Sequence, residues 1–395
     1  MVTFLHLPAE IRLAIYETYL ADHQVVRDRR QPSNEHIRVL HTCKQILSEA
    51  GPIFCSYVSL LHERQIHAFL ASSGHVVPSQ VAWADVANDG RFLQTSTKPD
   101  EEMAYPLSQL HAALHALPGL THLRVFECRQ GLPISLHSLV SRRFFLRFEE
   151  AMFPSSCAQR LQKYELHLGP SSRVRAFARI HPGNLRTVRF SGDCQLAPNT
   201  KFPALQNLTL HGVTGNYFDR HDIRECFPAA NLTSFAFVLD SKDGFQLRDL
   251  HLRSLAIGPG RHLQRLTLMG CIQLSSAAIA DCLSMLTSLS YLALSLITID
   301  ELRTNFVDHI PPTLRILKLH IRNAWFTPVF WSEERCICDS IEGILSARNP
   351  PLEQLALSLR SELLEEDGRR ERWHSIAQGI RLHLYIGPWE LQEHN

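Results

Sequence analysis

The sequence predicts an α/β protein in which a short N-terminal helical domain is followed by an irregular leucine-rich repeat solenoid. Three observations predict this architecture: a helix-like segment with two apolar faces near the N-terminus, a run of turn-forming residues before position 105, and a leucine phrase that recurs from position 120 onward. The 395 residues suffice for a small domain and a long repeat array. We expect a helical domain at 1–72, a linker or long loop with some structure at 73–106, and a repeat domain at 107–395.

The N-terminal segment LPAEIRLAIYETYL, residues 7–20, predicts a helix with two apolar stripes instead of one. One stripe consists of Leu7, Ile11, Ala14 and Ile15, and the nearly opposite one of Leu13, Tyr16 and Leu20. Pro8 suits the first helical turn, where its missing N–H has no consequence. An ordinary surface helix buries a single stripe. The second stripe therefore needs a cover, either from the chain's own core or from a partner protein.

A six-residue phrase, L-x-x-L-x-L with some apolar replacements, recurs along the rest of the chain. The first leucines of its copies are Leu120, Leu161, Leu185, Leu205, Leu232, Leu252, Leu263, Leu289, Leu314 and Leu352. Most copies are spaced in or near the period of leucine-rich repeats, about 20–29 residues. Leu252 and Leu263 are too close for two full repeats, so one of them is expected to open an irregular turn.

The phrase has a physical meaning, because alternate side chains of a short strand point to opposite sides. The leucines would point inward and stack on those of neighbouring coils, and the residues between them would line a concave surface. No single repeat closes its own core, so such an array is stable only by stacking. The alternative is another α/β arrangement, in which some copies of the phrase are chance apolar strings.

Helices are expected to return the chain between strands. Ser275 to Leu286 predicts one, with Ser275 as its N-cap. Thr298 to Glu301 has the form of a capping box that opens a second helix, and Cys336 to Ala347 predicts a third. The alternating segment Ile380 to Ile386 predicts a last strand that caps the array.

Composition limits the classes of function. The formal net charge is +1, so no global field favours nucleic acid or membrane binding. No apolar run reaches the roughly 18 residues of a membrane span, and the N-terminus lacks the zones of a signal peptide. The ten cysteines are scattered, mostly inside apolar runs, which indicates buried free thiols in a reducing compartment. We expect an intracellular protein, in the cytoplasm, the nucleus or both.

The sequence contains no HExxH, Cys-x-x-Cys, Gly-x-Ser-x-Gly or phosphate-loop motif. The thiols of Cys336 and Cys338 would lie about 200° apart on a helix, which favours a structural role over a metal site. Gly258-Pro259-Gly260 indicates a turn, since proline has no N–H for a phosphate. We therefore expect no enzyme activity, no cofactor and no metal.

The predicted concave positions carry more cations than carboxylates, although the whole chain is balanced. Such a surface would suit an acidic or phosphorylated protein. The alternative is the solvated polar face that every solenoid needs. The candidate partner-binding residues are Arg124, Lys163, Arg189, His211, Arg265, Tyr291 and Lys318.

Two blocks of the N-terminal region resemble fungal F-box proteins. Leu7 to Arg12, followed by Ile15 to Glu17, is similar to the opening helix of that family. Leu40 to Ile46 and Glu49 to Phe54 are similar to its motif L-x-T-C-[KR]-Q-I followed by E-A-x-P-[IV]-[FY]. The polar insert 22–36 departs from the family, because it is longer and more charged than the usual link between the first two helices.

The repeat region resembles the leucine-rich repeats of F-box proteins. Residues 263–282 are similar to the cysteine-containing repeat class, with Cys271 after the last leucine of the phrase, and Cys128 fits the same slot. The other copies lack Cys or Asn there, which predicts irregular turns.

The resemblance implies a substrate-recognition subunit of an SCF-type cullin–RING ubiquitin ligase. Its F-box would dock on the Skp adaptor and thereby on the cullin scaffold, and its repeats would bind a target protein of unknown identity, as a monomer within a hetero-complex. The resemblance places four residues at the adaptor: Leu7, Pro8, Ile11 and Ile15. The other stripe would pack on a helix that carries Cys43, Ile46, Leu47 and Ile53, although which stripe faces outward stays open. The alternative is a non-catalytic interaction scaffold in which the N-terminal helices cap the array.

Overall fold

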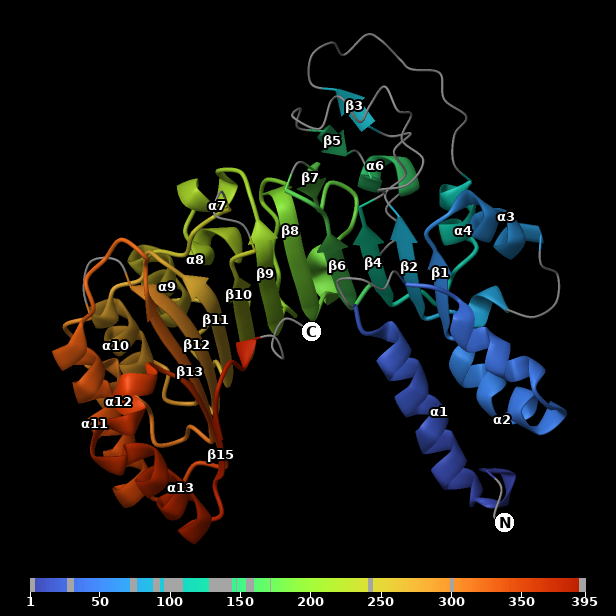
Figure 1. Cartoon of the computed structure of the whole chain (residues 1–395). Coiled ribbons are helices and arrows are strands. Elements are labelled where there is room, and N and C mark those ends of the chain that lie inside the picture. The colour runs from blue at the N-terminus through green and yellow to red at the C-terminus, as the bar shows by residue number, and fades with distance from the viewer. Residues whose placement is uncertain are drawn as a thin grey trace. The chain divides into compact units, whose positions relative to one another are not determined.

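Short apolar strands alternate with helices or turns through most of the chain (Figure 1). The computed structural model describes residues 4–26, 32–71, 77–87, 93–95, 109–127, 144–146, 148–153, 160–170, 172–240, 244–298 and 302–390. The chain divides into two units. Unit 1 comprises Met1–Leu185 with Gln195–Ala197, and unit 2 comprises Arg186–Cys194 with Pro198–His394.

Unit 1 begins with helices and continues into parallel strands. Its helices are η1 (Phe4–His6), α1 (Ala9–Gln24), η2 (Glu35–His41), α2 (Lys44–Phe54), α3 (Glu63–Ala71), η3 (Pro78–Gln80), α4 (Leu110–His115), α6 (Phe148–Met152) and η5 (Pro182–Asn184). Its strands are β1 (Tyr57–Leu60), β2 (Trp83–Ala87), β3 (Leu93–Thr95), β4 (His122–Phe126), β5 (Phe144–Leu146), β6 (Lys163–His167) and β7 (Ser172–Ala176). The strands β1, β2, β4 and β6 form a parallel sheet in this order. Beside it, β5 pairs antiparallel with β3 and parallel with β7.

Unit 2 is a run of strand-and-return modules. Its strands are β8 (Thr187–Leu196), whose last two residues belong to unit 1, and β9 (Asn207–Val213), β10 (Ser234–Val238), β11 (Arg265–Cys271), β12 (Tyr291–Thr298), β13 (Ile316–Asn323), β14 (Gln354–Ser358) and β15 (His383–Ile386). Each pairs in parallel with the next. The returns include α7 (Tyr217–Arg220), α8 (Ile223–Cys226), α9 (Asp249–Ile257), α10 (Ser276–Met285), η6 (Phe306–His309), α11 (Trp331–Ala347), α12 (Ser361–Glu365), η7 (Glu366–Gly368) and α13 (Arg369–Gly379).

The leucine phrase stacks as predicted. Leu266, Leu292, Leu317 and Leu355 stand opposite one another on β11 to β14. Each of these side chains is no more than 1% exposed. Because alternate residues of a strand point to opposite sides, the residues between the leucines point away from this core. Figure 1 shows the helices of unit 2 along one side of its strands. We call the opposite side the open face. The predicted fold class is confirmed.

Several local predictions are also confirmed. The helix α10 begins after Ser275, whose side chain accepts a hydrogen bond from the Ala278 N–H. The helix α11 covers the predicted 336–347 segment and begins earlier, at Trp331. In it Cys338 is buried and Cys336 exposed. The last strand is β15, shorter than the predicted alternating segment.

One local prediction is wrong, and a second falls mostly outside the described residues. Leu252 and Leu255 belong to the helix α9 and not to a strand. Residues three apart lie on one side of a helix, so an L-x-x-L string fits both structures. Thr298 ends β12, and residues 299–301 of the predicted capping box lie outside the described residues. Of the parallel strands, β1 lies within residues 1–72 and β2 within residues 73–106, for which some structure was expected.

Candidate interaction surfaces

The helix α1 presents an exposed apolar stripe. Tyr16 and Leu20 are 3% and 6% exposed and pack in a cluster with Ala50 and Phe54 of α2. By contrast, Ile11 and Ile15 are 50% and 42% exposed. Two of the three residues of one predicted stripe are thus buried, and the isoleucines of the other stripe face outward.

The predicted adaptor residues therefore lie on the outer side of the helix or just before it. Pro8 is exposed and immediately precedes α1, and Leu7 is half-buried. The expectation that Leu13 and Leu47 pack between the helices is wrong, because they are 38% and 48% exposed. Ile46 and Ile53 do pack against the cluster.

Arg12 fixes α1 to α2 through an ion pair that the sequence analysis did not predict. Its Nε and Nη2 donate to the Glu49 carboxylate at 2.9 and 2.5 Å. Nη1 donates to the carbonyl oxygens of Leu5 and Leu7, just before the helix. The hydrogen bond from Arg12, with a second from Gln45, lowers the pKa of Glu49 to about 2. Such a two-pronged pair sets the orientation of the helix as well as its position.

On the sheet of unit 1, a polar network surrounds Asp85 of β2, whose side chain is fully buried. Arg124 of β4 donates to both oxygens of this carboxylate at 2.7 and 2.5 Å. The Tyr57 hydroxyl and the Trp83 indole N–H complete the set at 2.7 and 3.0 Å. Burial and the Asp85 charge raise the pKa of Tyr57, so it stays a donor.

Arg124 is thus 4% exposed, although the sequence analysis singled it out as a candidate for partner binding. Its third contact is a hydrogen bond of 2.7 Å from Nη1 to the carbonyl oxygen of Gln24, the last residue of α1. Its guanidinium also lies 4.7 Å from the centre of the Trp83 ring. The Arg124 side chain thus connects the end of α1 to the sheet.

A second polar group lies on β6, one strand further along the same face. The Lys163 ammonium is 3.0 Å from the Glu165 carboxylate and 4.9 Å from the centre of the Trp83 ring. The His167 Nε2 lies 3.3 Å from Glu165, and its ring stacks on Phe126. Burial would raise the pKa of Glu165, but the hydrogen bond from His167 and the charge of Lys163 lower it to about 2. Lys163 is only partly exposed.

The open face of unit 2 brings together three of the candidate partner-binding residues. The Arg265 guanidinium lies 3.5 Å, and the Lys318 ammonium 5.7 Å, from the centre of the Tyr291 ring. Arg265 is exposed, whereas Tyr291 and Lys318 are buried. Arg189 and His211, on β8 and β9, are half-buried.

The open face of unit 2 is also apolar in its middle, where the sequence analysis expected a polar surface. Five residues gather on it with Trp389 in one buried cluster: Val238, Met269, Tyr291, Ala293 and Ala356. Trp389 follows β15 by three residues and is 1% exposed. Its neighbour Glu390 contacts His320 of β13. Trp389 and Glu390 lie outside every motif that the sequence analysis identified.

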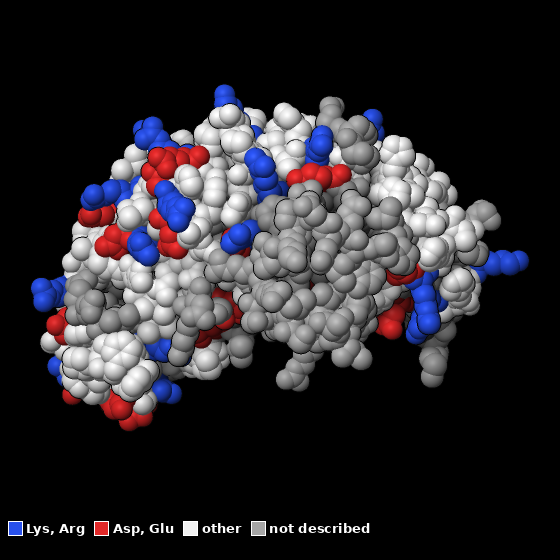
Figure 2. Space-filling model, turned by 90° about the horizontal axis from the view of Figure 1, so that it is seen from above, with Lys and Arg blue, Asp and Glu red and all other residues white. Residues whose placement is uncertain are grey.

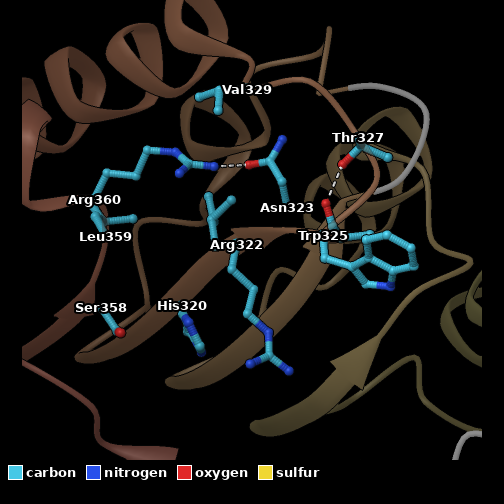
Figure 3. Close-up of a pocket in the computed structure, with 11 residues that line it drawn as sticks. His320, Arg322, Asn323, Trp325, Thr327, Val329, Ser358, Leu359 and Arg360 are labelled. Atoms are coloured by element: carbon cyan, nitrogen blue, oxygen red, sulfur yellow. Dashed lines mark hydrogen bonds between the residues drawn. The ribbon is translucent and has the colours of Figure 1, made fainter.

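A hollow of about 400 Å³ lies where β13 and β14 end (Figure 3). Arg360 hydrogen-bonds the Asn323 side chain across it and pairs with Glu334 at 2.8 Å. Arg322 and Trp325 extend on its other side in Figure 3, and Trp325 is 89% exposed. The next residue, Phe326, is 60% exposed, so two adjacent aromatic side chains meet solvent beside this hollow.

Charge does not single out a docking region on the face shown in Figure 2, where the cations and carboxylates of the described residues lie interspersed. Among these residues no three His, Cys, Asp or Glu side chains come together as metal ligands would. The described helices also include none that is long and apolar enough to cross a bilayer.

The chain matches no protein-family model, and no curated protein matches it.

Proposed function

We propose that this protein is the substrate-recognition subunit of an SCF-type cullin–RING ubiquitin ligase. The exposed stripe of α1 binds the Skp adaptor, which links the chain to the cullin scaffold. The repeat array binds a target protein and holds it near the conjugating enzyme, so catalysis rests on raised local concentration. This role needs no catalytic residue, cofactor or metal in the chain.

One observation carries the proposal: α1 is anchored from one side only. Tyr16, Leu20 and the Arg12–Glu49 pair fix the helix, while Ile11 and Ile15 stay half exposed. Large apolar side chains that line up on a rigid element are typical of a docking surface. The F-box resemblance assigns the same residues to the adaptor, and the structure supports it by turning this stripe outward.

The second candidate is an interaction scaffold unrelated to ubiquitin ligases. The hydrogen bond from Arg124 to Gln24 favours it, because a capping helix would be tied to the sheet in this way. A cap, however, gives no role to Ile11 and Ile15. A scaffold function therefore accounts for the hydrogen bond at the end of α1, whereas a ligase function also accounts for the exposed Ile11 and Ile15.

The test is binding of purified Skp adaptor to the full chain and to Ile11→Asp. A charge placed in the centre of an apolar interface should weaken binding by about 30-fold or more, since central contacts carry about 2 kcal/mol or more. Ile11 makes no part of the buried cluster, so the variant should melt at the wild-type temperature.

The matched control is Leu13→Asp, which places the same charge on the same helix but on another side. It should bind the adaptor as the wild-type chain does. If Ile11→Asp and Leu13→Asp bind equally well, the exposed stripe is not the docking site. If the wild-type chain fails to bind the adaptor, the scaffold function is favoured.

A further inference from the structure

The open face of unit 2 already holds a ligand-like segment of this chain. Trp389 belongs to one buried apolar cluster with outward-pointing residues of β10, β11, β12 and β14, and partly buried Ile316 of β13 packs against this cluster. On a solvated face these positions would carry polar side chains. Val238, Met269, Ala293 and Ala356 are apolar instead, and the buried Trp389 ring belongs to one cluster with them. We call the place of this ring on the open face the recess.

Trp389 is held there by more than its apolar area. Its indole N–H donates to the carbonyl oxygen of Leu319 at 3.2 Å. A buried indole generally needs such an acceptor. The recess therefore recognises an aromatic ring with a donor at its edge, for which tryptophan is the best match.

The next residue, Glu390, adds a second point of recognition. Its carboxylate contacts His320, and both side chains are only 17% exposed. His320 is further held by the Ser295 hydroxyl at 3.4 Å. An aromatic side chain followed directly by an acidic one thus meets a matching recess and a matching nitrogen.

The occupying segment is short and turns sharply. The Gly387 N–H still pairs with the Leu357 carbonyl oxygen of β14 at 2.8 Å. Two residues later the Trp389 indole reaches Leu319 of β13, so the chain turns back over β14 between these two points. Only Gly387 and Pro388 separate the strand from Trp389. Such a tether gives the segment a high effective concentration, so a partner competes only when the segment is absent or displaced.

The surface is also larger than its occupant. His320 lines the hollow of Figure 3 as well, and beyond it lie Arg322 and the almost fully exposed Trp325. A longer partner could bury these side chains in addition to the recess.

We propose that the open face of unit 2 binds peptides in which an aromatic residue is followed directly by an acidic one, and that Trp389–Glu390 is an internal ligand of this site. Binding of such peptides by unit 2 is independent of the proposed function. That these peptides mark the targets of a ubiquitin ligase rests on the proposed function.

The experiment measures binding of a dye-labelled peptide with the sequence of residues 386–395, IGPWELQEHN, by fluorescence anisotropy. Two receptor variants free the site: a chain that ends after Gly387, and the complete chain with Trp389→Ala. Both should bind the peptide saturably, and the wild-type chain should bind it at least about tenfold more weakly because its own segment competes. Peptides with Trp389→Ala or Glu390→Gln serve as matched controls and should bind at least about tenfold and several-fold more weakly.

The inference is overturned if folded forms of either variant do not bind the peptide, or if the Trp389→Ala peptide binds equally well. It is also overturned if both variants unfold, because Trp389 would then be an ordinary core residue. The assay contains no adaptor. Ile11→Asp combined with the truncation should leave peptide binding unchanged, so this test and that of the ligase function fail independently.

Discussion

The two units bury the outward-pointing residues of their sheets in different ways. In unit 1 a polar network does so: Asp85 receives four hydrogen bonds, and its partner Arg124 reaches the end of α1. In unit 2 one side chain, Trp389, covers an apolar recess from a short tether. Several directional hydrogen bonds to a buried charge fit a single arrangement, whereas the recess holds its ring by apolar packing and one hydrogen bond, which a similar side chain of a partner can replace. The Asp85–Arg124 network of unit 1 is therefore a permanent contact, whereas the Trp389 segment of unit 2 can be exchanged for a partner.

The largest expected effect comes from breaking the polar join. Asp85→Ala leaves the Arg124 guanidinium buried without its carboxylate, which should lower the free energy of unfolding by about 3–5 kcal/mol. Denaturant unfolding of the full chain measures it. The control is Asp85→Ala combined with Arg124→Met, which removes both charges and should recover much of the loss. If the single variant is as stable as wild type, the Asp85 network does not hold the sheet of unit 1 and the end of α1 together.

A smaller effect should appear with pH at Glu165, on the neighbouring strand. Its folded pKa of about 2 lies below the usual value of 4.5, so it stabilises the fold above pH 4.5. This contribution, at most about 3 kcal/mol, should be lost as the pH falls from 4.5 toward 2.

The measurement for Glu165 compares the unfolding free energy of the wild-type chain and of Glu165→Gln between pH 6 and pH 3. The wild-type advantage should be largest at pH 6 and shrink on acidification. A difference that is constant over this range would show that Glu165 is not held as an ionised carboxylate by His167 and Lys163.

The smallest effect is expected on the open face of unit 2, at the cation over Tyr291. Arg265 is exposed, so Arg265→Gln should lower the unfolding free energy by about 1 kcal/mol or less. Thermal unfolding measures this change, and Arg261→Gln, at another exposed cation of unit 2, is its control. A loss of unfolding free energy comparable to that of Asp85→Ala would mean that charged groups also hold the open face of unit 2. The two units would then not differ as described.

The regular part of the fold could be predicted because its signals are local. The leucine ladder follows from alternation within each strand, and Ser275 caps its helix from three residues away. Leu252 was misassigned for an equally local reason, since its spacing to Leu255 suits a helix as well as the repeat phrase.

The two closures could not be predicted, because each depends on where distant segments meet. Asp85 lies in a stretch that reads as a loop, and its partner Arg124 follows 39 residues later. The Gly387-Pro388 pair indicates a turn, but nothing in the sequence shows that Trp389 reaches β13 and joins an apolar cluster that extends to β10. The outward stripe of α1 was predicted in part: Ile11 and Ile15 face outward as the resemblance implied, while Leu13 does not pack inward.

The measurement that tests this account most directly is hydrogen–deuterium exchange of the full chain with and without the Skp adaptor. The account predicts slower exchange in α1 and α2, over Ala9–Gln24 and Lys44–Phe54, and unchanged exchange in β10 to β14, which are kept for the target. Slower exchange on β10 to β14, with none at the N-terminal helices, would contradict the division of roles between the two units.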